Sequence, residues 1–356
     1  MDPIQFDGYT IRRATETDVR GFLDLHASVF GTWPDSLSRE IFEWKYEDNP
    51  YFDELPVIVA ESGGEIVGAK GHFGLNMALG GTTILGIQTA DLMVHPAHRR
   101  NGILTKMVEL DTAIYDTGRQ LFFGFPARTA TAGYLDAGRR KVENPLFVRL
   151  LSPTELTDVV PFNPILRTIG TKGYKSYLRL VDGVSQSGKE YDVEVENDHP
   201  IELLCTLYER RVPPGIHAER TAEFYEWRLS DPLHDMRTYI ARCRGDPVAA
   251  MVVSESDDHV HIREISPSNT SQQPVRALLE TIISDFSDRD FLTSWCPQSL
   301  DEMAFVKAGF IRSNVIPRFP YATDMVVRSI GERWEIEGHR IDEPSSWDIQ
   351  LLERDY

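Results

Sequence analysis

The apolar positions of the chain follow two spacings, and the same order of spacings occurs twice. Residues 9–13 alternate apolar and polar side chains, as a half-buried strand does. Residues 18–30 then place apolar side chains three and four positions apart, as an amphipathic helix does. Residues 191–195 and 200–211 show the same two patterns in the same order. We therefore predict that two similar halves each begin with a strand and a helix.

A matching aromatic segment follows in each half. Residues 42–50 begin Phe-Glu-Trp-Lys and end in Asn-Pro, and residues 225–232 begin Tyr-Glu-Trp-Arg and end in Asp-Pro. Two strands with period-2 alternation come next in each half, over 57–73 with a turn at Gly63-Gly64, and over 238–254 with a turn at Gly245-Asp246. The aromatic segment and the strand pair belong to the repeated unit.

The later part of each half keeps one constant spacing. Four residue pairs are each 171 positions apart: Pro96 and Pro267, Pro126 and Pro297, Tyr134 and Phe305, and Gly138 and Gly309. The earlier markers Trp44 and Trp227 are 183 positions apart (227 − 44), so the first half holds about a dozen extra residues. We assign these to a longer strand pair over 74–86. The ordered set predicts a tandem duplication.

The expected architecture is α/β (an α+β arrangement with mixed sheets) in two domains, because 356 residues exceed what one hydrophobic core organises. We expect a first domain over 1–150, a connector over 151–190, a second domain over 191–330 and a tail over 331–356. The connector has a helical rhythm interrupted by Pro161 and Pro164. The tail holds Trp334 and Trp347 among alternating apolar residues, and we expect it to add a strand.

Composition narrows the class of protein. The net charge is −18, and only eight of the 37 basic residues are lysine, a balance that keeps a protein soluble at high salt. We infer a salt-loving source, with an ordinary acidic enzyme as the alternative. The chain has no basic stripe for a nucleic acid, no apolar run for a membrane span and no signal-peptide pattern, so a cytoplasmic protein is expected. Its three scattered cysteines predict no metal site.

The segment 90–105 carries the most informative chemistry. An apolar strand over Leu92–Val94 stops at Pro96, a polar turn with Gly102 follows, and a helix begins at Ile103. Free N–H groups at a helix start, with a glycine that allows close approach, form a cradle for phosphate oxygens. Arg99 and Arg100 add charged donors. Taken alone, one glycine and two arginines favour an ordinary strand–turn–helix with two solvated arginines.

The run His98-Arg-Arg-Asn-Gly-Ile-Leu104 resembles the acetyl-coenzyme A motif of the GNAT superfamily of N-acetyltransferases. Arg99 and Gly102 match that motif, whereas Leu104 replaces its last glycine or alanine, as in the enhanced-intracellular-survival subgroup. The resemblance implies two tandem GNAT-type domains and acetyl-CoA as cosubstrate. It further implies that the strand binds the pantetheine arm and the turn binds the pyrophosphate. The implied cofactor-binding residues are Leu92, Met93, Val94, Arg99, Arg100, Asn101, Gly102, Ile103, Leu104 and Thr105, with Thr129 and Ala130 in a later helix.

Tyr134 lies four residues before Gly138 in that later helix, after an apolar strand over 121–125. The resemblance implies that this tyrosine protonates the departing thiolate. A phenol can act as a general acid when it lies within hydrogen-bond reach of the sulfur. Helical position alone favours a core aromatic at Tyr134 over a general acid.

The base that accepts the proton of the attacking amine has several candidates. Asp91 directly precedes the cofactor strand, and Glu43 lies in the aromatic segment expected on the acceptor side. The subgroup resemblance points to the terminal carboxylate, here that of Tyr356, although this chain lacks the subgroup's additional C-terminal domain. A structural role for each carboxylate is the alternative.

The second half is expected to be degenerate. Where the first half has its arginine pair and glycine, the second has the sequence Ser268-Asn-Thr-Ser-Gln-Gln-Pro274. Pro274 removes a backbone donor from the expected cradle, and Phe305 lacks the hydroxyl of Tyr134. Both differences predict that this copy shapes the protein without binding the coenzyme.

The sequence therefore predicts an N-acetyltransferase that joins acetyl-CoA and a primary amine in one ternary complex. The amine belongs to an unidentified small molecule or peptide, and the subgroup resemblance allows a homo-oligomer. The alternatives are a related acyl or aminoacyl transferase, and a non-catalytic acyl-CoA-binding regulatory protein.

Overall fold

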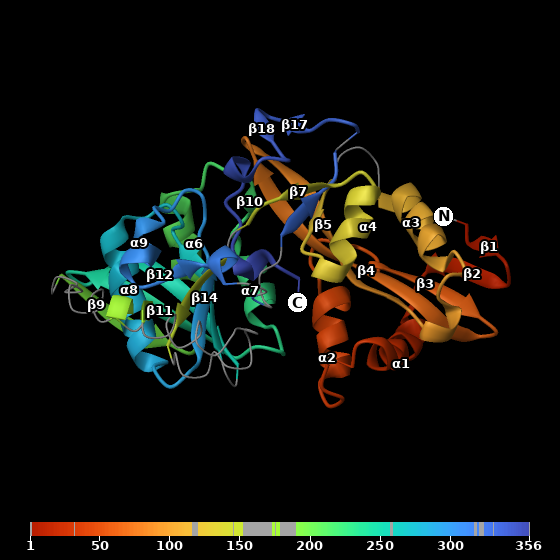
Figure 1. The fold of residues 1–356 in the computed structure, drawn as a ribbon, viewed down its shortest axis with the longest axis horizontal. Helices are drawn as coiled ribbons and strands as arrows, with labels where there is room; N and C mark the ends of the chain where they lie inside the picture. The colour runs from red at the N-terminus through yellow and green to blue at the C-terminus, as the bar shows by residue number, and fades with distance from the viewer. Residues whose placement is uncertain are drawn as a thin grey trace.

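Two β-sheets form the framework of the protein. The structure, a computed structural model, describes residues 2–31, 33–115, 120–144, 146–151, 173–174, 176–178, 190–256, 259–316, 319, 324–329 and 331–355. Within these residues, one large sheet has nine strands, the other has seven, and helices pack against both (Figure 1). Each sheet is mixed, because β5 runs parallel to β6 and β13 runs parallel to β14, whereas the other pairs are antiparallel. The predicted mixed α/β class is confirmed.

The first sheet has the strand order β1 (Ile4–Phe6), β2 (Tyr9–Arg13), β3 (Val57–Ser62), β4 (Glu65–Leu79), β5 (Thr82–Val94), β6 (Leu121–Gly124), β16 (Met325–Val327) and β7 (Arg140–Val142), and β10 (His217–Ala218) pairs with β4. The second sheet has the order β15 (Ile311–Arg312), β8 (Leu146–Leu150), β14 (Phe291–Trp295), β13 (His259–Ser266), β12 (Asp246–Glu255), β11 (Met236–Cys243) and β9 (Tyr191–Glu196).

The hairpins form where the sequence predicts them. Gly63 and Gly64 have φ values of 61° and 87°, the left-handed conformation that the tight turn between β3 and β4 requires. Strands β4 and β5 are much longer than their counterparts β12 and β13. The extra residues of the first half therefore lie in this strand pair, as expected.

Helices cover both faces of the first sheet (Figure 1). On one face lie α1 (Val19–Val29), α2 (Ser38–Phe42) and the π-helical turn η2 (Glu43–Glu47), and on the other lie α3 (Ile103–Tyr115) and α4 (Arg128–Asp136). Helix α1 forms against the sheet because Val19, Phe22 and Leu25 recur at helical spacing and are all buried. The second half repeats this arrangement with α6 (Ile201–Arg210), α7 (Ala222–Leu229), α8 (Gln272–Asp285) and α9 (Met303–Lys307).

The two halves exchange one strand each. Strand β8 follows β7 in the chain but pairs with β14 and β15 of the second sheet. Strand β16 comes from the second half but lies between β6 and β7 of the first sheet. The predicted boundaries at residues 150 and 330 therefore do not separate the sheets. The all-buried pattern of β8 fits a central strand of either sheet, so local sequence could not assign it.

Equivalent residues of the two halves meet at the centre of the molecule. The indole Nε1 of Trp44 donates to the carbonyl of Trp227 at 2.8 Å, and Nε1 of Trp227 donates to the carbonyl of Trp44 at 2.7 Å. Their rings stack at 5.9 Å between centroids. A contact in which each residue does the same to its equivalent is what a two-fold axis produces. The halves are therefore related by an approximate two-fold axis near these tryptophans.

The tail differs from the prediction. Strands β17 (Glu335–Ile336) and β18 (His339–Arg340) pair with each other and join neither large sheet. The chain then returns through the short 3₁₀ turns η5 (Pro344–Ser346) and η6 (Leu351–Glu353), and its end lies between the two halves (Figure 1). Trp347, Leu351 and Leu352 are buried there, so the tail is part of the core. None of the described helices combines the length and apolar character needed to cross a bilayer.

Candidate functional site

Strand β5 carries a β-bulge at Asp91 and Leu92. On β4, Ala69 pairs with Met93 and Gly71 pairs with Ala90, so two residues of β5 face Lys70 alone. Asp91 has a φ of 41°, a left-handed conformation that is uncommon outside glycine but that aspartate adopts more readily than most residues. Because a bulge leaves one residue outside the ladder, it presents backbone groups to a ligand.

The bulge lies where two parallel strands separate. Strand β5 pairs with β6 over three positions, from Gly86 with Leu121 to Gln88 with Phe123. Among the described residues, β5 then continues from Thr89 to Val94 without pairing to β6. We refer to this unpaired part of β5, which includes the bulge, as the opening.

A cavity of about 520 Å³ begins at this opening and ends at the start of α3. Its lining includes Leu92, Met93, Val94, Arg99, Arg100, Gly102, Ile103, Leu104 and Thr105, which are nine of the ten residues predicted from the strand and the turn. Val29 and Phe30 at the end of α1 and His98 complete the described lining. The structure therefore gathers the predicted strand and turn residues around one cavity.

The turn before α3 is fixed by side chains of the first strands. Asn101 does not line the cavity but donates through Nδ2 to the hydroxyl of Tyr9 at 3.0 Å. The same hydroxyl lies 3.1 Å from Nδ1 of His98. Gly102 has a φ of 78°, and a Cβ at this position would lie 3.1 Å from the ring of Phe6. Asn101 and Gly102 therefore shape the turn that presents the helix start.

Two exposed arginines flank this helix start. The Nε of Arg99 donates to the carbonyl of Val94 at 3.0 Å, which folds this side chain over the end of β5. Arg100 has a φ of 68°, so the backbone reverses here before the helix begins. Unpaired N–H groups at the start of a 13-residue helix, beside two guanidinium groups, form a site for an anion.

Helix α4 places Tyr134 beside β5, and Tyr134 is not part of the described lining of this cavity. The half-buried Tyr134 shares a hydrogen bond with the side chain of Thr89, the first residue of β5 beyond its pairing with β6. Burial raises the pKa of Tyr134, and Arg139 opposes this shift. Thr129 and Ala130 lie in the first turn of α4, where Ala130 is exposed; the side chain of Thr129 lies outside the described part of the structure.

A buried lysine lies on the opposite face of the sheet. The Nζ of Lys45, in η2, is 2.9 Å from Oδ2 of Asp91 and 2.7 Å from Oδ1 of Asp355. Burial lowers the pKa of Lys45, but the two carboxylates outweigh this effect and raise it overall. The hydroxyl of Tyr46 donates to Asp91 at 2.5 Å, and Nε2 of His26 is 3.9 Å from its other oxygen. Asp91 is thus held by three side chains of α1 and η2.

The C-terminal tail reaches this cluster from the second half. The buried amide of Gln88 donates to the carbonyl of Glu353 at 2.6 Å and accepts from the backbone N–H of Asp355 at 3.2 Å. Burial raises the pKa of Asp355 to about 6, against the opposing effect of Lys45. Tyr356, predicted as a possible base, lies outside the described residues, immediately after Asp355.

Glu43 is not part of this cluster. Its Oε1 accepts from Nε of Arg39 at 2.7 Å, four residues earlier in the chain, and its side chain is 42% exposed. Of the predicted bases in the described residues, Asp91 lies at the bulge and Glu43 is paired on the surface.

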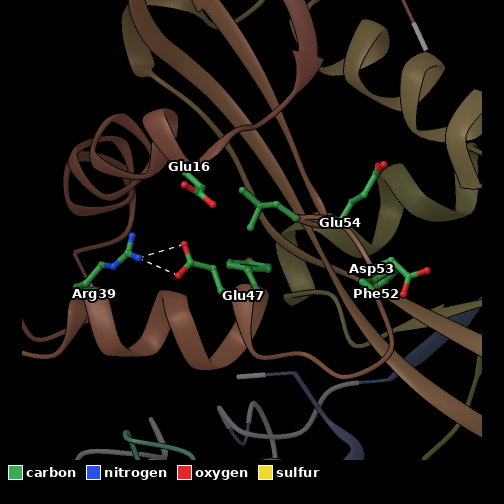
Figure 2. A pocket seen from close by; sticks show the side chains of 8 residues that line it. Glu16, Arg39, Glu47, Phe52, Asp53 and Glu54 are labelled. Atoms are coloured by element: carbon green, nitrogen blue, oxygen red, sulfur yellow. Dashed lines mark hydrogen bonds and ion pairs between the residues drawn. The ribbon is translucent and has the colours of Figure 1, made fainter.

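A second cavity, of about 430 Å³, lies between Glu16, Arg39, Glu47 and the segment 52–55 (Figure 2). Glu16, Glu47, Asp53 and Glu54 line it together with Arg39, Tyr46, Phe52 and Leu55. Arg39 holds Glu47 at 2.8 Å, as the dashed lines of Figure 2 show, and Arg13 pairs with Glu54. Two of the four carboxylates are thereby neutralised, so the cavity is less negative than its composition suggests.

The corresponding region of the second half has different side chains. Helix α8 begins at Gln272 and buries Pro274 in its first turn, and α9 buries Phe305 completely. Strand β13 also has an irregularity, where Val252 pairs with Glu264 and Val253 pairs with Ile262. The second half thus keeps the backbone pattern of a bulged strand, but it lacks the arginine pair and glycine of the turn and the hydroxyl of Tyr134.

Sequence reasoning missed Lys45, Gln88 and Asp355. The signal for Lys45 was weak, because it lies within an aromatic segment and resembles any lysine of an amphipathic helix. Asp355 lies in a polar C-terminal end and is 310 positions from Lys45 (355 − 45). No group of three or more His, Cys, Asp or Glu residues in the described part of the chain is placed to hold a metal ion.

The structure thus combines a mixed sheet that has a bulged strand with a turn before a helix that can bind an anion. Residues 10–138 match the family model described as acetyltransferase (GNAT) domain. The matched residues span little more than a third of the sequence. This match supports acyl transfer in general. No curated protein matches the sequence significantly.

Solved structures share the fold of the whole chain. A GCN5-related N-acetyltransferase from Anabaena variabilis covers 90% of this chain with a TM-score of 0.57 at 10% identity, and 72% of its own length is matched. A probable N-acyltransferase of unknown function from Enterococcus faecalis gives the same coverages, a TM-score of 0.59 and 12% identity. A GCN5-related N-acetyltransferase from Kribbella flavida gives 0.55 and 16%, with 90% and 70% covered. At these identities the likeness concerns the fold, including the second sheet.

Proposed function

We propose that the protein is an N-acetyltransferase that transfers the acetyl group of acetyl-CoA to a primary amine. The observation that carries this proposal is the single cavity shared by the bulged strand and the start of α3. The N–H groups of the helix start and the two arginines would bind the pyrophosphate, and β5 would bind the pantetheine arm. The fit between HRRNGIL and the enhanced-intracellular-survival subgroup supports the same cosubstrate.

The proposed reaction takes place in one ternary complex. The amine nitrogen attacks the thioester carbon, and backbone N–H groups at the bulge stabilise the developing oxyanion. As the C–S bond breaks, Tyr134 gives its proton to the thiolate. The proton of the amine passes to Asp91, which is the predicted base that lies beside the bulge. Holding the amine and the thioester together supplies much of the rate acceleration.

Calorimetry and turnover test this proposal together. Acetyl-CoA titrated into the protein at high KCl should bind once per chain, because the second half lacks the arginine pair and the glycine. A panel of amines, assayed for acetyl-dependent release of free thiol, should then identify an acceptor. The absence of any binding heat would overturn the proposal, and two equal sites would overturn the assignment of the second half as silent.

Replacing Tyr134 with Phe separates an enzyme from a binding protein. The substitution should lower kcat by roughly 10²- to 10⁴-fold and leave the binding of acetyl-CoA unchanged. Tyr191→Phe is the matched control, because Tyr191 is on β9 of the second sheet, where its hydroxyl donates to Gln273. A regulatory protein would release no thiol with any amine, in the wild type or in either variant.

A further inference from the structure

Arg139 covers the ring of Tyr134. Its guanidinium carbon is 4.6 Å from the centre of the phenol ring. Helix α4 ends in a Schellman arrangement, with Gly138 at a φ of 81° and the backbone N–H of Arg139 donating to the carbonyl of Tyr134 at 3.1 Å. This arrangement brings Arg139, which follows Gly138, back over Tyr134, which lies four positions before that glycine. The backbone therefore fixes which side chain lies on Tyr134.

The second half contains the same arrangement with different side chains. Gly309 has a φ of 83°, and the N–H of Phe310 donates to the carbonyl of Phe305 at 3.0 Å. The rings of Phe305 and Phe310 meet at 5.0 Å, edge to face, and both are buried. Two apolar rings thus occupy the two side-chain positions of this motif in the half that we propose does not bind the coenzyme. The half with the cofactor cavity has a phenol and a guanidinium at the same two positions.

A guanidinium needs a reason to occupy this position. Burial lowers the pKa of Arg139, which reflects the unfavourable removal of its charge from water. Among the described residues, the charged neighbours of Arg139 do not provide a simple ion pair. Asp111 of α3 is already bound by Lys70 and by His72, and Arg328, which follows β16, repels Arg139. If these two positions served only packing, two phenylalanines would suffice, as Phe305 and Phe310 do in the second half.

We propose that Arg139 is a positioning residue for Tyr134: it holds the phenol ring against Thr89 and stabilises the phenolate that forms when Tyr134 protonates the departing thiolate. This inference rests on the proposed function. In the step concerned, the C–S bond of the thioester breaks, the sulfur takes the electron pair and the phenol proton, and the negative charge passes to the phenolate oxygen. A guanidinium on the ring face favours that charge, through its positive field and its cation–π contact.

The positive charge of Arg139 matters because, without it, the pKa of the phenol that donates the proton is poorly matched to the pKa of the thiol that forms. An ordinary thiol has a pKa of about 8.5 and an ordinary tyrosine a pKa of about 10. Burial raises the pKa of Tyr134 and widens this gap, whereas Arg139 and the hydrogen bond from Thr89 narrow it. Asp111, which lies on α3, raises the pKa of Tyr134 and so widens the gap again. Arg139 is therefore the charged neighbour that makes Tyr134 a better acid toward a thiolate.

A double-mutant cycle between the two positions tests the inference. Arg139→Phe reproduces the side-chain pairing of the second half, so the variant should fold, which thermal unfolding checks. In the full-length enzyme it should lower kcat about tenfold with the KM for acetyl-CoA changed by less than about twofold. The alkaline limb of the pH profile of kcat/KM should move to higher pH, because the pKa of Tyr134 rises. Arg139→Lys keeps a cation and should restore part of the rate.

In the Tyr134→Phe background, Arg139→Phe should have almost no further effect on kcat, because no phenolate forms there. An equal loss in both backgrounds, with an unmoved alkaline limb, would show that Arg139 only packs and would overturn the inference. In that case the wild type would still bind acetyl-CoA and release thiol, so the proposed function would stand. A wild type that neither binds acetyl-CoA nor releases thiol overturns the proposed function instead, so the two failures are distinguishable.

Discussion

Lys45 shows how a single residue joins distant parts of the chain. It is fully buried, and its two carboxylate partners come from the bulge of β5 and from the C-terminal tail. Removing an ammonium group from water is unfavourable unless opposite charges surround it. The contact is therefore possible only when the tail has returned to the first sheet. Lys45 makes the position of Asp91 depend on the second half of the chain.

Asp355 should make stability pH-dependent in an unusual direction. Its pKa in the folded protein is about 6, above the ordinary value of 3.8. A raised pKa gives a contribution that is fully present below about pH 4 and is lost as the pH rises through 6. We expect Asp355→Asn, which mimics the protonated form, to gain stability relative to the wild type between pH 4 and about 6.5. Thermal unfolding of both proteins across this range measures it.

The wild type and Asp355→Asn should be compared by their difference at each pH, because other carboxylates act in the opposite direction. Arg12 holds the pKa of Asp18 at about 2. The stability that the ionised Asp18 contributes is therefore lost as the pH falls from about 4 through 2. A difference between the two proteins that stays constant with pH would contradict the expectation for Asp355.

At the scale of elements, the exchanged strands decide what can fold alone. Strand β8 pairs on both sides in the second sheet, and β16 pairs on both sides in the first. Removing β16 leaves a gap between β6 and β7 of the first sheet. One hydrophobic cluster also includes buried residues of both sheets, such as Phe73, Val148 and Met325.

Separated halves should therefore fail to fold and should recover when combined. We expect residues 1–151 and 190–356, expressed alone, to show no cooperative unfolding and no binding of acetyl-CoA. Expressed together, they should co-purify as a one-to-one complex, because each supplies the strand that the other lacks. Circular dichroism melts and calorimetry measure both outcomes. A first half that unfolds cooperatively alone would contradict this expectation.

The sequence predicted local elements better than their partners. Strands, hairpin turns and α1 follow from side-chain spacing and from glycines such as Gly63, which act within a few residues. The turn before α3 was equally local, so its residues could be placed around one site. The destination of β8, the return of the tail and the pairing of Lys45 with Asp355 depend on contacts between residues more than a hundred positions apart. Side-chain pattern contains no information on which of two similar sheets a buried strand joins.

The net charge of −18 acts at the scale of the whole molecule. Like charges on one surface repel one another, and salt weakens this repulsion over distances longer than the Debye length, which is about 10 Å at 0.1 M and 3 Å at 1 M. We expect the unfolding temperature to rise by on the order of 5–10 °C between 0.1 M and 2 M KCl. Calorimetric scans at neutral pH measure it.

The same scans near pH 5 provide the control. The sequence gives an isoelectric point of about 5.0, so the net repulsion largely disappears there and the effect of KCl should shrink. An equal rise at both pH values would assign the salt effect to something other than the net charge.

The reciprocal tryptophan contact has a consequence for how such a protein can diverge. Trp44 and Trp227 touch as equivalent residues do in a symmetric homodimer whose subunits have swapped their last strands. In a true homodimer every substitution appears twice, so neither active site can change without the other. Covalent fusion removes that constraint: one half can keep its reactive groups while its twin becomes a scaffold that still closes the partner's sheet.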